Sequence, residues 1–322
     1  MGFFSKLFGG GGDGKKASAK RPTKPEPPKP SGPPKRAPLK RLNLEKRFKL
    51  HNRVGQGSMS KVWRATDTET GRTVVIKVLD TPKTAALKKR FVGLKRPDEG
   101  EIAVTLDHPN VVKTFEYGTT NQKEEFLVME FVDGVGFNVL VETRAKQLMG
   151  NELDYLIQMA EGIEYFHRSG YIHRDICPRN AMVTTEGVVK LIDFGLAVPN
   201  TPDFRKPGNR TGTANYMAPE LIKRQPTDPR IDVFSFGVTA FETFTGTLPW
   251  ESAQSLEAML KHVNQPGRDP REARADLPEG IVKVIQKGIE RDREKRFQTM
   301  REFIDAMKMQ RRILKGEGAE QV

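Results

Sequence analysis

The stretch His173-Arg174-Asp175-Ile176-Cys177-Pro178-Arg179-Asn180 is the most informative part of this 322-residue chain. Asp193-Phe194-Gly195 begins thirteen residues after Asn180, and Ala218-Pro219-Glu220 follows farther along. Any one of these short motifs could arise by chance. The three motifs in this order and at these intervals are highly specific when taken together. We therefore interpret them as parts of one site rather than as separate turns.

Two further motifs lie upstream. In the run from Val54 to Val62, glycines stand at 55 and 57, and Ser60 takes the place of the third glycine in G-x-G-x-x-G-x-V. Val74-Val75-Ile76-Lys77 then matches V-A-I-K with valine for alanine. The combined set resembles the protein kinase family over roughly residues 48 to 312. The run from Gly212 to Glu220, GTANYMAPE, is most similar to serine/threonine kinases of eukaryotic type from bacteria.

The resemblance implies an enzyme that transfers the γ-phosphate of ATP, with Mg²⁺, to serine or threonine hydroxyls of protein substrates. It also implies an α+β fold with two lobes, a small β-rich one followed by a larger helical one. The residue pattern agrees, because apolar strand segments come first and helical spacing follows. We expect a helix from about residue 84 to 106, a strand over 126–131, and helices near 153–163 and 232–245.

Charge is distributed unevenly along the chain. The net charge is +13, and residues 1–49 hold fourteen Lys or Arg against three Asp or Glu, so the remainder is close to neutral. Proline alternates with basic residues from Lys15 to Arg41, a composition that cannot bury a core. We therefore expect a disordered basic tail over 1–47, a kinase domain over 48–314, and a short flexible C-terminus over 315–322. Because the basic excess belongs to the tail, no nucleic-acid partner is expected.

The cysteine count and the apolar runs bear on location. Cys177 is the only cysteine, and no apolar run approaches the ~20 residues of a membrane-spanning helix, so we expect a cytoplasmic protein. Residues 1–41 could still contact a membrane surface or a partner, because Phe3, Phe4, Leu7 and Phe8 would share one face of a helix. The sequence leaves these two alternatives open.

The phosphate-binding residues follow from the chemistry of phosphoryl transfer, which needs positioning and positive charge. Glycines at 55 and 57 let backbone N–H groups approach the phosphates, and Lys77 would pair with the α- and β-phosphates. The resemblance implies that Glu99 orients Lys77, because it stands nine residues before His108, the interval that the family shows before its H-P-N; Glu101 is the alternative.

The remaining site residues are assigned from the resemblance. Asp175 is the expected catalytic base, and Asn180 and Asp193 are the expected Mg²⁺ ligands, since Mg²⁺ prefers oxygen donors. Met129 is the expected gatekeeper, with backbone groups of Glu130 and Val132 facing the adenine edge. The nucleotide-binding set comprises Val54, Gly55, Gly57, Ser60, Val62, Val75, Lys77, Glu99, Met129, Glu130 and Val132.

One position departs from the family pattern. Serine/threonine kinases place lysine two residues after the catalytic aspartate, and this chain has Cys177 there. Arg179 could supply the missing cation at the γ-phosphate, as in many receptor tyrosine kinases. Alternatively, Arg179 is a solvated bystander and the enzyme is weak or inactive. Thr213 favours serine or threonine acceptors, because in that subfamily this threonine bonds the catalytic aspartate.

Other pairings and a regulatory segment are also implied. Glu220 should form a buried ion pair with Arg296, and Asp232 should bond the backbone of the catalytic loop. The segment from Gly195 to Ala218 should be a phosphorylation-controlled switch, in which phosphate on Thr201 or Thr211 pairs with Arg174. Two competing functions are a catalytically silent kinase fold that acts as a scaffold and a small-molecule phosphotransferase of related fold.

Overall fold

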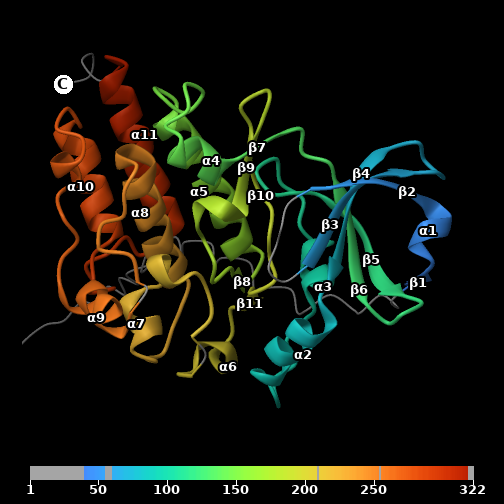
Figure 1. Cartoon of the computed structure of the whole chain (residues 1–322). Coiled ribbons are helices and arrows are strands. Elements are labelled where there is room, and N and C mark those ends of the chain that lie inside the picture. Colours follow the sequence, from blue (N-terminus) through green and yellow to red (C-terminus); the bar gives the residue numbers. More distant parts are fainter. Residues whose placement is uncertain (1–39, 55–59, 209, 254, 318–322) are drawn as a thin grey trace, which may run out of the picture. The chain divides into compact units, whose positions relative to one another are not determined.

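A six-stranded sheet dominates the first part of the chain in the computed structural model, which describes residues 40–54, 60–208, 210–253 and 255–317 (Figure 1). The strand order is β1-β5-β6-β4-β3-β2, and every pairing is antiparallel except that of β1 with β5. The strands are β1 (Lys40–Leu42), β2 (Phe48–Arg53), β3 (Ser60–Asp67), β4 (Thr73–Leu79), β5 (Thr114–Thr120) and β6 (Glu125–Glu130). β6 confirms the strand expected over 126–131.

Alternation along the central strands gives this sheet two different faces. Val74, Ile76 and Val78 of β4 pack with Phe126 and Val128 of β6 in a small hydrophobic cluster of their own. The intervening residues of β4 and β6 point the other way, because successive side chains of a strand alternate. That second face carries Lys77 and the candidate site residues described below.

Folded structure begins before residue 48. Helix α1 (Leu44–Arg47) follows β1, and the Arg47 guanidinium donates hydrogen bonds to the carboxylates of Asp67 and Glu116 at 2.9–3.2 Å. These contacts join α1 to strands β3 and β5. The segment from 40 to 47 is thus ordered, although we expected residues 1–47 to be a tail. Residues 1–39 and 318–322 lie outside the described residues, so the expectations for them stay predictions.

Two short helices replace the single helix expected over 84–106, and that prediction was wrong. α2 (Thr81–Lys89) and α3 (Glu99–Ala103) are separated by a turn that includes Gly93 at φ +83°. Pro97 disfavours helical backbone in the residue before it, and Asp98 starts α3 with a capping box to Glu101.

The second part of the chain is mainly helical (Figure 1). It also contains a three-stranded sheet, in the order β10-β9-β7, and a two-stranded sheet formed by β11 and β8. The longer helices are α4 (Phe137–Glu142), α5 (Glu152–Arg168), α8 (Arg230–Thr245), α9 (Leu256–Asn264), α10 (Glu279–Gly288) and α11 (Met300–Leu314). The short elements are β7 (Gly134–Gly136), β8 (Tyr171–Ile172), η1 (Pro178–Asn180), β9 (Ala181–Thr184), β10 (Val189–Leu191), β11 (Val198–Pro199), α6 (Pro202–Arg205), η2 (Ala214–Tyr216), α7 (Pro219–Ile222) and η3 (Pro270–Glu272).

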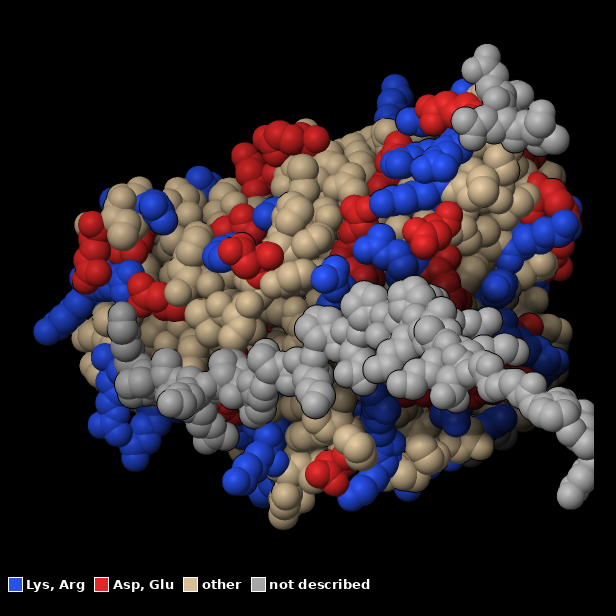
Figure 2. Space-filling view, turned by 180° about the vertical axis from the view of Figure 1, so that it is seen from behind, with Lys and Arg blue, Asp and Glu red and all other residues tan. Residues whose placement is uncertain are grey.

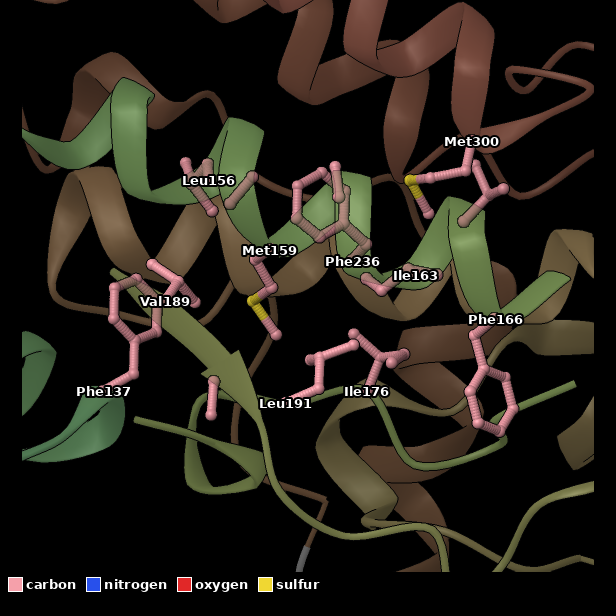
Figure 3. Close-up of a cluster of buried hydrophobic side chains, with 14 of the residues drawn as sticks. Phe137, Leu156, Met159, Ile163, Phe166, Ile176, Val189, Leu191, Phe236 and Met300 are labelled. Carbon is pink, nitrogen blue, oxygen red and sulfur yellow. The ribbon is translucent and has the colours of Figure 1, made fainter. Parts of the chain in front are cut away.

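The helical core is built around α5 and α8. Figure 3 shows Leu156, Met159 and Ile163 of α5 turned toward Phe236 of α8 and Leu191 of β10. These side chains are almost completely buried. Helix α8 ends at Gly246, whose φ of +73° suits glycine at a helix C-terminus. Helices α5 and α8 confirm the predictions for 153–163 and 232–245, and the two lobes confirm the predicted α+β fold.

The surface agrees with the near-neutral charge of the chain after residue 49. Figure 2 shows basic and acidic side chains interspersed over much of the visible, described surface on this face. Within the described residues, no helix is long and apolar enough to cross a membrane.

Candidate active site

A buried lysine stands at the centre of the site. The Lys77 Nζ on β4 donates to Glu99 Oε1 on α3 at 2.6 Å and to Asp193 Oδ1 at 3.1 Å. Lys77 and Glu99 are buried, whereas the Asp193 side chain is 44% exposed. The Lys77 ammonium group thus bridges two carboxylates, and Asp193 stays accessible to a ligand.

The start of α3 decides which glutamate reaches Lys77. Glu101 accepts a hydrogen bond from the Asp98 backbone N–H at 2.9 Å, so it serves the helix cap. Glu99, two residues earlier, turns inward to the lysine. The sequence analysis placed Glu99 first and Glu101 second, and the geometry agrees with that order.

Electrostatics favour the charged forms of Lys77 and Asp193. Burial disfavours the Lys77 cation, but the Asp193 and Glu99 carboxylates outweigh it and raise the pKa of Lys77 above its usual value. Burial raises the pKa of Glu99, and Lys77 opposes this rise. For Asp193, the loss of part of its hydration is outweighed by Lys77 and the Gly195 N–H, which lower its pKa. An ionised Asp193 beside a cationic Lys77 suits the binding of a metal ion and phosphate groups.

Cross-strand pairing gathers several residues of the expected nucleotide set around Lys77. Val62 lies opposite Lys77 across β3 and β4, and Val75 lies opposite Met129 across β4 and β6. Residues two apart on β4 share a face, so Val62, Val75, Lys77 and Met129 line one side of the sheet. The Val54 N–H donates to the Val62 carbonyl at 2.9 Å, which joins the residue after β2 to β3.

The rest of the expected nucleotide set divides into described and undescribed positions. The Glu130 N–H donates to the Lys113 carbonyl, so the backbone group that Glu130 can offer to an adenine edge is its carbonyl. Val132 and Ser60 are buried. Gly55 and Gly57 lie outside the described residues, and their role stays a prediction.

The expected base is held by two residues. Thr213 donates to Asp175 Oδ1 from both its backbone N–H and its hydroxyl, each at 2.8 Å. The Asn180 amide donates to Asp175 Oδ2 at 2.9 Å and to its backbone carbonyl at 2.7 Å. The carboxylate is thus fixed in orientation while remaining half-buried. These bonds agree with the implied pairing of the threonine with the aspartate.

Helix α8 fixes the backbone of the catalytic loop from below. Asp232, fully buried, accepts hydrogen bonds from the backbone N–H groups of His173 and Arg174 at 2.7 and 2.8 Å. His167 lies 2.8 Å from the same carboxylate. Arg174 has a φ of +69°, a costly value for a non-glycine residue. The Asp232 bonds therefore hold a strained loop in place, as expected from the sequence.

The expected metal ligands suit Mg²⁺ chemically. Because the Asn180 amide nitrogen faces Asp175, its carbonyl oxygen is directed away from that residue. The Ile192 N–H donates to the backbone carbonyl of Asn180 at 3.1 Å, which holds the chain before Asp193 against η1. Asn180 and Asp193 would hold the ion through oxygen, with phosphate and water completing the shell.

Cys177 and Arg179 differ sharply in environment. Cys177 is buried, its Sγ lies 3.9 Å from Thr213 Oγ1, and burial raises the pKa of the thiol to about 12. A neutral thiol supplies no cation. Arg179 is exposed, and its positive charge opposes the rise in the pKa values of Tyr216 and Glu242. Its expected role at the γ-phosphate stays a prediction.

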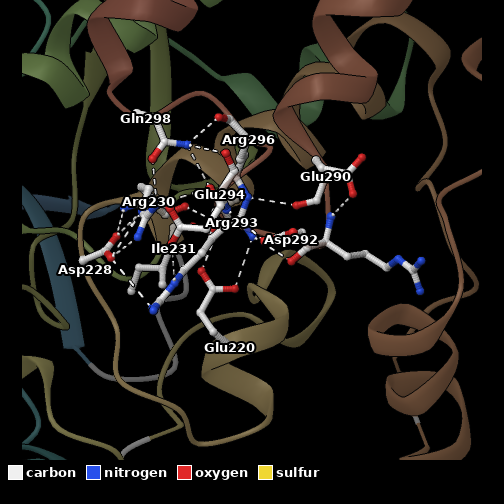
Figure 4. Close-up of polar contacts among 12 residues, drawn as sticks. Glu220, Asp228, Arg230, Ile231, Glu290, Asp292, Arg293, Glu294, Arg296 and Gln298 are labelled. Carbon is white, nitrogen blue, oxygen red and sulfur yellow. Dashed lines mark hydrogen bonds and ion pairs between the residues drawn. The ribbon is translucent and has the colours of Figure 1, made fainter.

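A buried ion pair anchors the end of the segment after the site. Arg296 donates to both carboxylate oxygens of Glu220, at 3.0 and 3.2 Å (Figure 4). It also donates to the backbone carbonyls of Glu290 and Arg230. The predicted Glu220–Arg296 pair is confirmed, and it ties α7 to the loop before α11.

Sequence reasoning missed two contacts near the site. The Tyr216 hydroxyl donates to Glu242 at 2.5 Å, which anchors the loop after Thr213 to α8. Arg96 donates to the backbone carbonyls of Gly195 and Ala197. Pro97 signals the break before α3, but no motif in the sequence marks the contact that Arg96 makes.

Comparison with known proteins agrees with this geometry. The family model described as protein kinase domain matches residues 48–307. The chain belongs to the protein kinase family. Its relatives include a probable serine/threonine-protein kinase of Clostridium acetobutylicum, 31% identical over 82% of this chain and 40% of that protein. The serine/threonine-protein kinase PknA of Mycobacterium tuberculosis is 30% identical over 83% of this chain and 62% of that protein.

A third relative, a probable serine/threonine-protein kinase of Streptomyces coelicolor, is 30% identical over 80% of this chain and 39% of that protein. The chain thus spans about two fifths to three fifths of the length of these bacterial relatives. The shared part is the kinase domain.

Proposed function

We propose that this chain is an ATP- and Mg²⁺-dependent protein kinase that phosphorylates serine or threonine. The observation that carries the proposal is the simultaneous hydrogen bonding of Asp175 to Thr213 and Asn180, beside an assembled Lys77–Glu99–Asp193 triad. The relatives are named serine/threonine-protein kinases, which supports the same acceptor class.

The residues divide the work of transfer among them. Asp175 orients the acceptor hydroxyl and accepts its proton, and the bonds from Thr213 and Asn180 fix the carboxylate for this task. Lys77 compensates the charge of the α- and β-phosphates, and Glu99 keeps its ammonium group in place. Mg²⁺, held through Asn180 and Asp193, would neutralise charge on the phosphate oxygens.

Two other functions make different predictions. A silent scaffold would bind nucleotide without transfer, and only the Cys177 substitution favours it. A small-molecule phosphotransferase would not need the Thr213–Asp175 bond or the anchored Ala218-Pro219-Glu220 segment. Both features are present, which supports a protein acceptor.

The test is incubation with labelled ATP, Mg²⁺ and a generic basic protein, with aminoglycosides and sugars as alternative acceptors. The proposal expects label on serine or threonine of the protein. Lys77→Met and Asp193→Asn should each retain no more than a few per cent of the wild-type rate with an intact fold. Transfer only to the small acceptors, or nucleotide binding without any transfer, would contradict the proposal.

Protein substrates, location and the role of the tail also remain proposals. Residues 1–41 would contact an anionic membrane surface or a partner, and the composition of the tail is the support. Binding of a peptide of residues 1–41 to vesicles with and without phosphatidylserine, read by sedimentation, separates these two choices. A cytoplasmic setting is supported by the single buried cysteine.

A further inference from the structure

We propose that Arg96 is a positioning residue that holds the beginning of the activation segment, residues 195–205, against the approach to α3. Its two hydrogen bonds close a ring of contacts that includes the Lys77–Glu99–Asp193 triad. The effect on catalysis rests on the proposed function, whereas the effect on the segment does not.

The local sequence fixes where Arg96 can reach. Pro97 restricts the residue before it to extended backbone, and Asp98 begins α3 as its N-cap. Arg96 therefore stands at a defined point three residues before Glu99. Since Glu99 is tied to Lys77 at 2.6 Å, the position of Arg96 is coupled to that of the buried ion pair.

The guanidinium of Arg96 hydrogen-bonds the backbone immediately after Asp193-Phe194. Its Nη2 donates to the Gly195 carbonyl at 2.5 Å, and its Nε donates to the Ala197 carbonyl at 2.9 Å. The planar donor fork of arginine suits two acceptors at once, which the point charge of lysine cannot match. The same group lies 5.4 Å from the centre of the Phe91 ring, which supports it from one side.

These bonds form a closed ring. Lys77 bonds Glu99, and Arg96 lies three residues before Glu99 on the same connection. Arg96 bonds the Gly195 carbonyl, the Gly195 N–H donates to Asp193 Oδ1 at 2.9 Å, and that oxygen accepts from Lys77 at 3.1 Å. Gly195 is thus held at both its N–H and its carbonyl. Arg96 thus holds Gly195, and Gly195 in turn holds the Asp193 carboxylate.

The surroundings of Gly195 leave little freedom for a different arrangement. A Cβ at this position would lie 3.2 Å from Asp193 Oδ1 and 3.3 Å from Glu99 Oε2. The activation segment is therefore in close contact with Glu99 at Gly195, the residue whose carbonyl Arg96 binds.

A second contact joins the same two segments. Phe91, in the turn after α2, meets Phe204 of α6 with ring centres 6.1 Å apart, and both rings are buried. In Figure 1, α2 lies beside α6 at the lower edge of the molecule. The connection from α2 to α3 thus holds residues 195–205 at two points, of which Arg96 is the one nearest Asp193.

The experiment compares Arg96→Met, Arg96→Gln and a matched control, Arg72→Met, by hydrogen–deuterium exchange without nucleotide. Arg72 is an exposed arginine of the same lobe. Methionine keeps the bulk of the stem but donates no hydrogen bond, and glutamine keeps one donor group. We expect amides in residues 194–206 to exchange at least tenfold faster in Arg96→Met, with Arg96→Gln intermediate. Peptides of α8 should be unchanged, and Arg72→Met should match the wild type throughout.

Kinetics give a second readout. In Arg96→Met, kcat/KM for ATP should fall at least tenfold, and the Mg²⁺ concentration for half-maximal rate should rise, since Asp193 is no longer fixed. Exchange of residues 194–206 within twofold of the wild type would overturn the proposal, and so would an equal rise in residues 194–206 and α8. Because the exchange arm needs no catalysis, it decides the positioning role even if the chain transfers no phosphate.

Discussion

At the scale of single residues, the catalytic loop combines an expected base with an unexpected neighbour. Asp175 is fixed by Thr213 and Asn180, whereas Cys177 offers only a buried, neutral thiol where the family keeps a cation. Thr213 Oγ1 lies 3.9 Å from the Cys177 Sγ, so the side chain that favours Ser/Thr acceptors packs directly on the substituted position. Either Arg179 therefore supplies the positive charge that the missing lysine would give, or the loop works without that charge.

The Arg179 prediction follows from this substitution. If Arg179 stabilises charge on the γ-phosphate, Arg179→Ala should lower kcat by orders of magnitude and raise the KM for ATP much less. Cys177→Lys in the same background should restore part of the loss. Steady-state kinetics with a protein substrate measure both effects. A loss below about threefold would make Arg179 a bystander, in keeping with its exposed position beside Tyr216 and Glu242.

At the scale of elements, the Glu220–Arg296 pair holds α7 to the loop before α11. Glu220→Ala should lower the free energy of unfolding by about 3 kcal/mol, because it leaves the buried Arg296 without its counter-ion. The control is Glu251→Ala, which removes a solvent-exposed partner of Lys261 and should cost under about 1 kcal/mol. Urea denaturation measures both variants. Equal losses would show that the buried pair adds nothing beyond an exposed one.

Helix α9 carries a buried histidine that should make stability depend on pH. His262 stacks on Trp250 with ring centres 4.4 Å apart, and burial lowers the pKa of His262 to about 4, with a bond to the Met217 backbone offsetting part of this. Between about pH 6.5 and pH 4, His262 is protonated in the unfolded chain but neutral in the folded chain. The free energy of unfolding should therefore fall by up to about 3 kcal/mol as pH drops through this window.

Denaturation from pH 7 to pH 4 tests this expectation against His262→Phe, which keeps an aromatic ring but cannot titrate. The variant should lose part of the wild-type pH dependence, whereas His51→Gln, at an exposed position, should keep it. Identical pH profiles for the wild type and His262→Phe would contradict the assigned burial effect.

The elements also show how far sequence reasoning reaches. A short continuous apolar run identified β6, helical spacing identified α5, and a longer apolar run ending at Gly246 identified α8. The connection from residue 81 to 103 was misjudged, since apolar residues suggested one helix while Gly93 and Pro97 divided it. Motifs located Lys77, Asp175 and Asp193, but Arg96 belongs to no motif. Its role depends on backbone carbonyls of a distant segment, which no local pattern encodes.

At the scale of the whole molecule, the two candidate threonines of the activation segment differ in exposure. Thr201 is exposed, whereas Thr211 is buried with no hydrogen bond to its hydroxyl among the described residues. A phosphate could be added to Thr201 in this arrangement, but Thr211 must first become accessible. We therefore expect phosphorylation of Thr201 before Thr211 when the protein is incubated with ATP.

Mass spectrometry of the peptide containing residues 198–205, compared over a time course with the peptide that contains Thr211, measures this order. Thr201→Val should leave the peptide unmodified and lower the protein-kinase rate if phosphate on Thr201 promotes activity. Fully active protein with no phosphothreonine in the segment would place control elsewhere.

The central claim is that Asp175, held by Thr213 and Asn180, accepts the proton of a protein hydroxyl during transfer from ATP. The most direct measurement is the single-turnover rate of phosphate transfer to serine or threonine, for the wild type and Asp175→Asn, with nucleotide affinity measured alongside. We predict a loss of about 10²- to 10⁴-fold in rate with nucleotide affinity nearly unchanged. Equal rates for the two proteins, or no transfer by a wild type that binds ATP, would contradict the account.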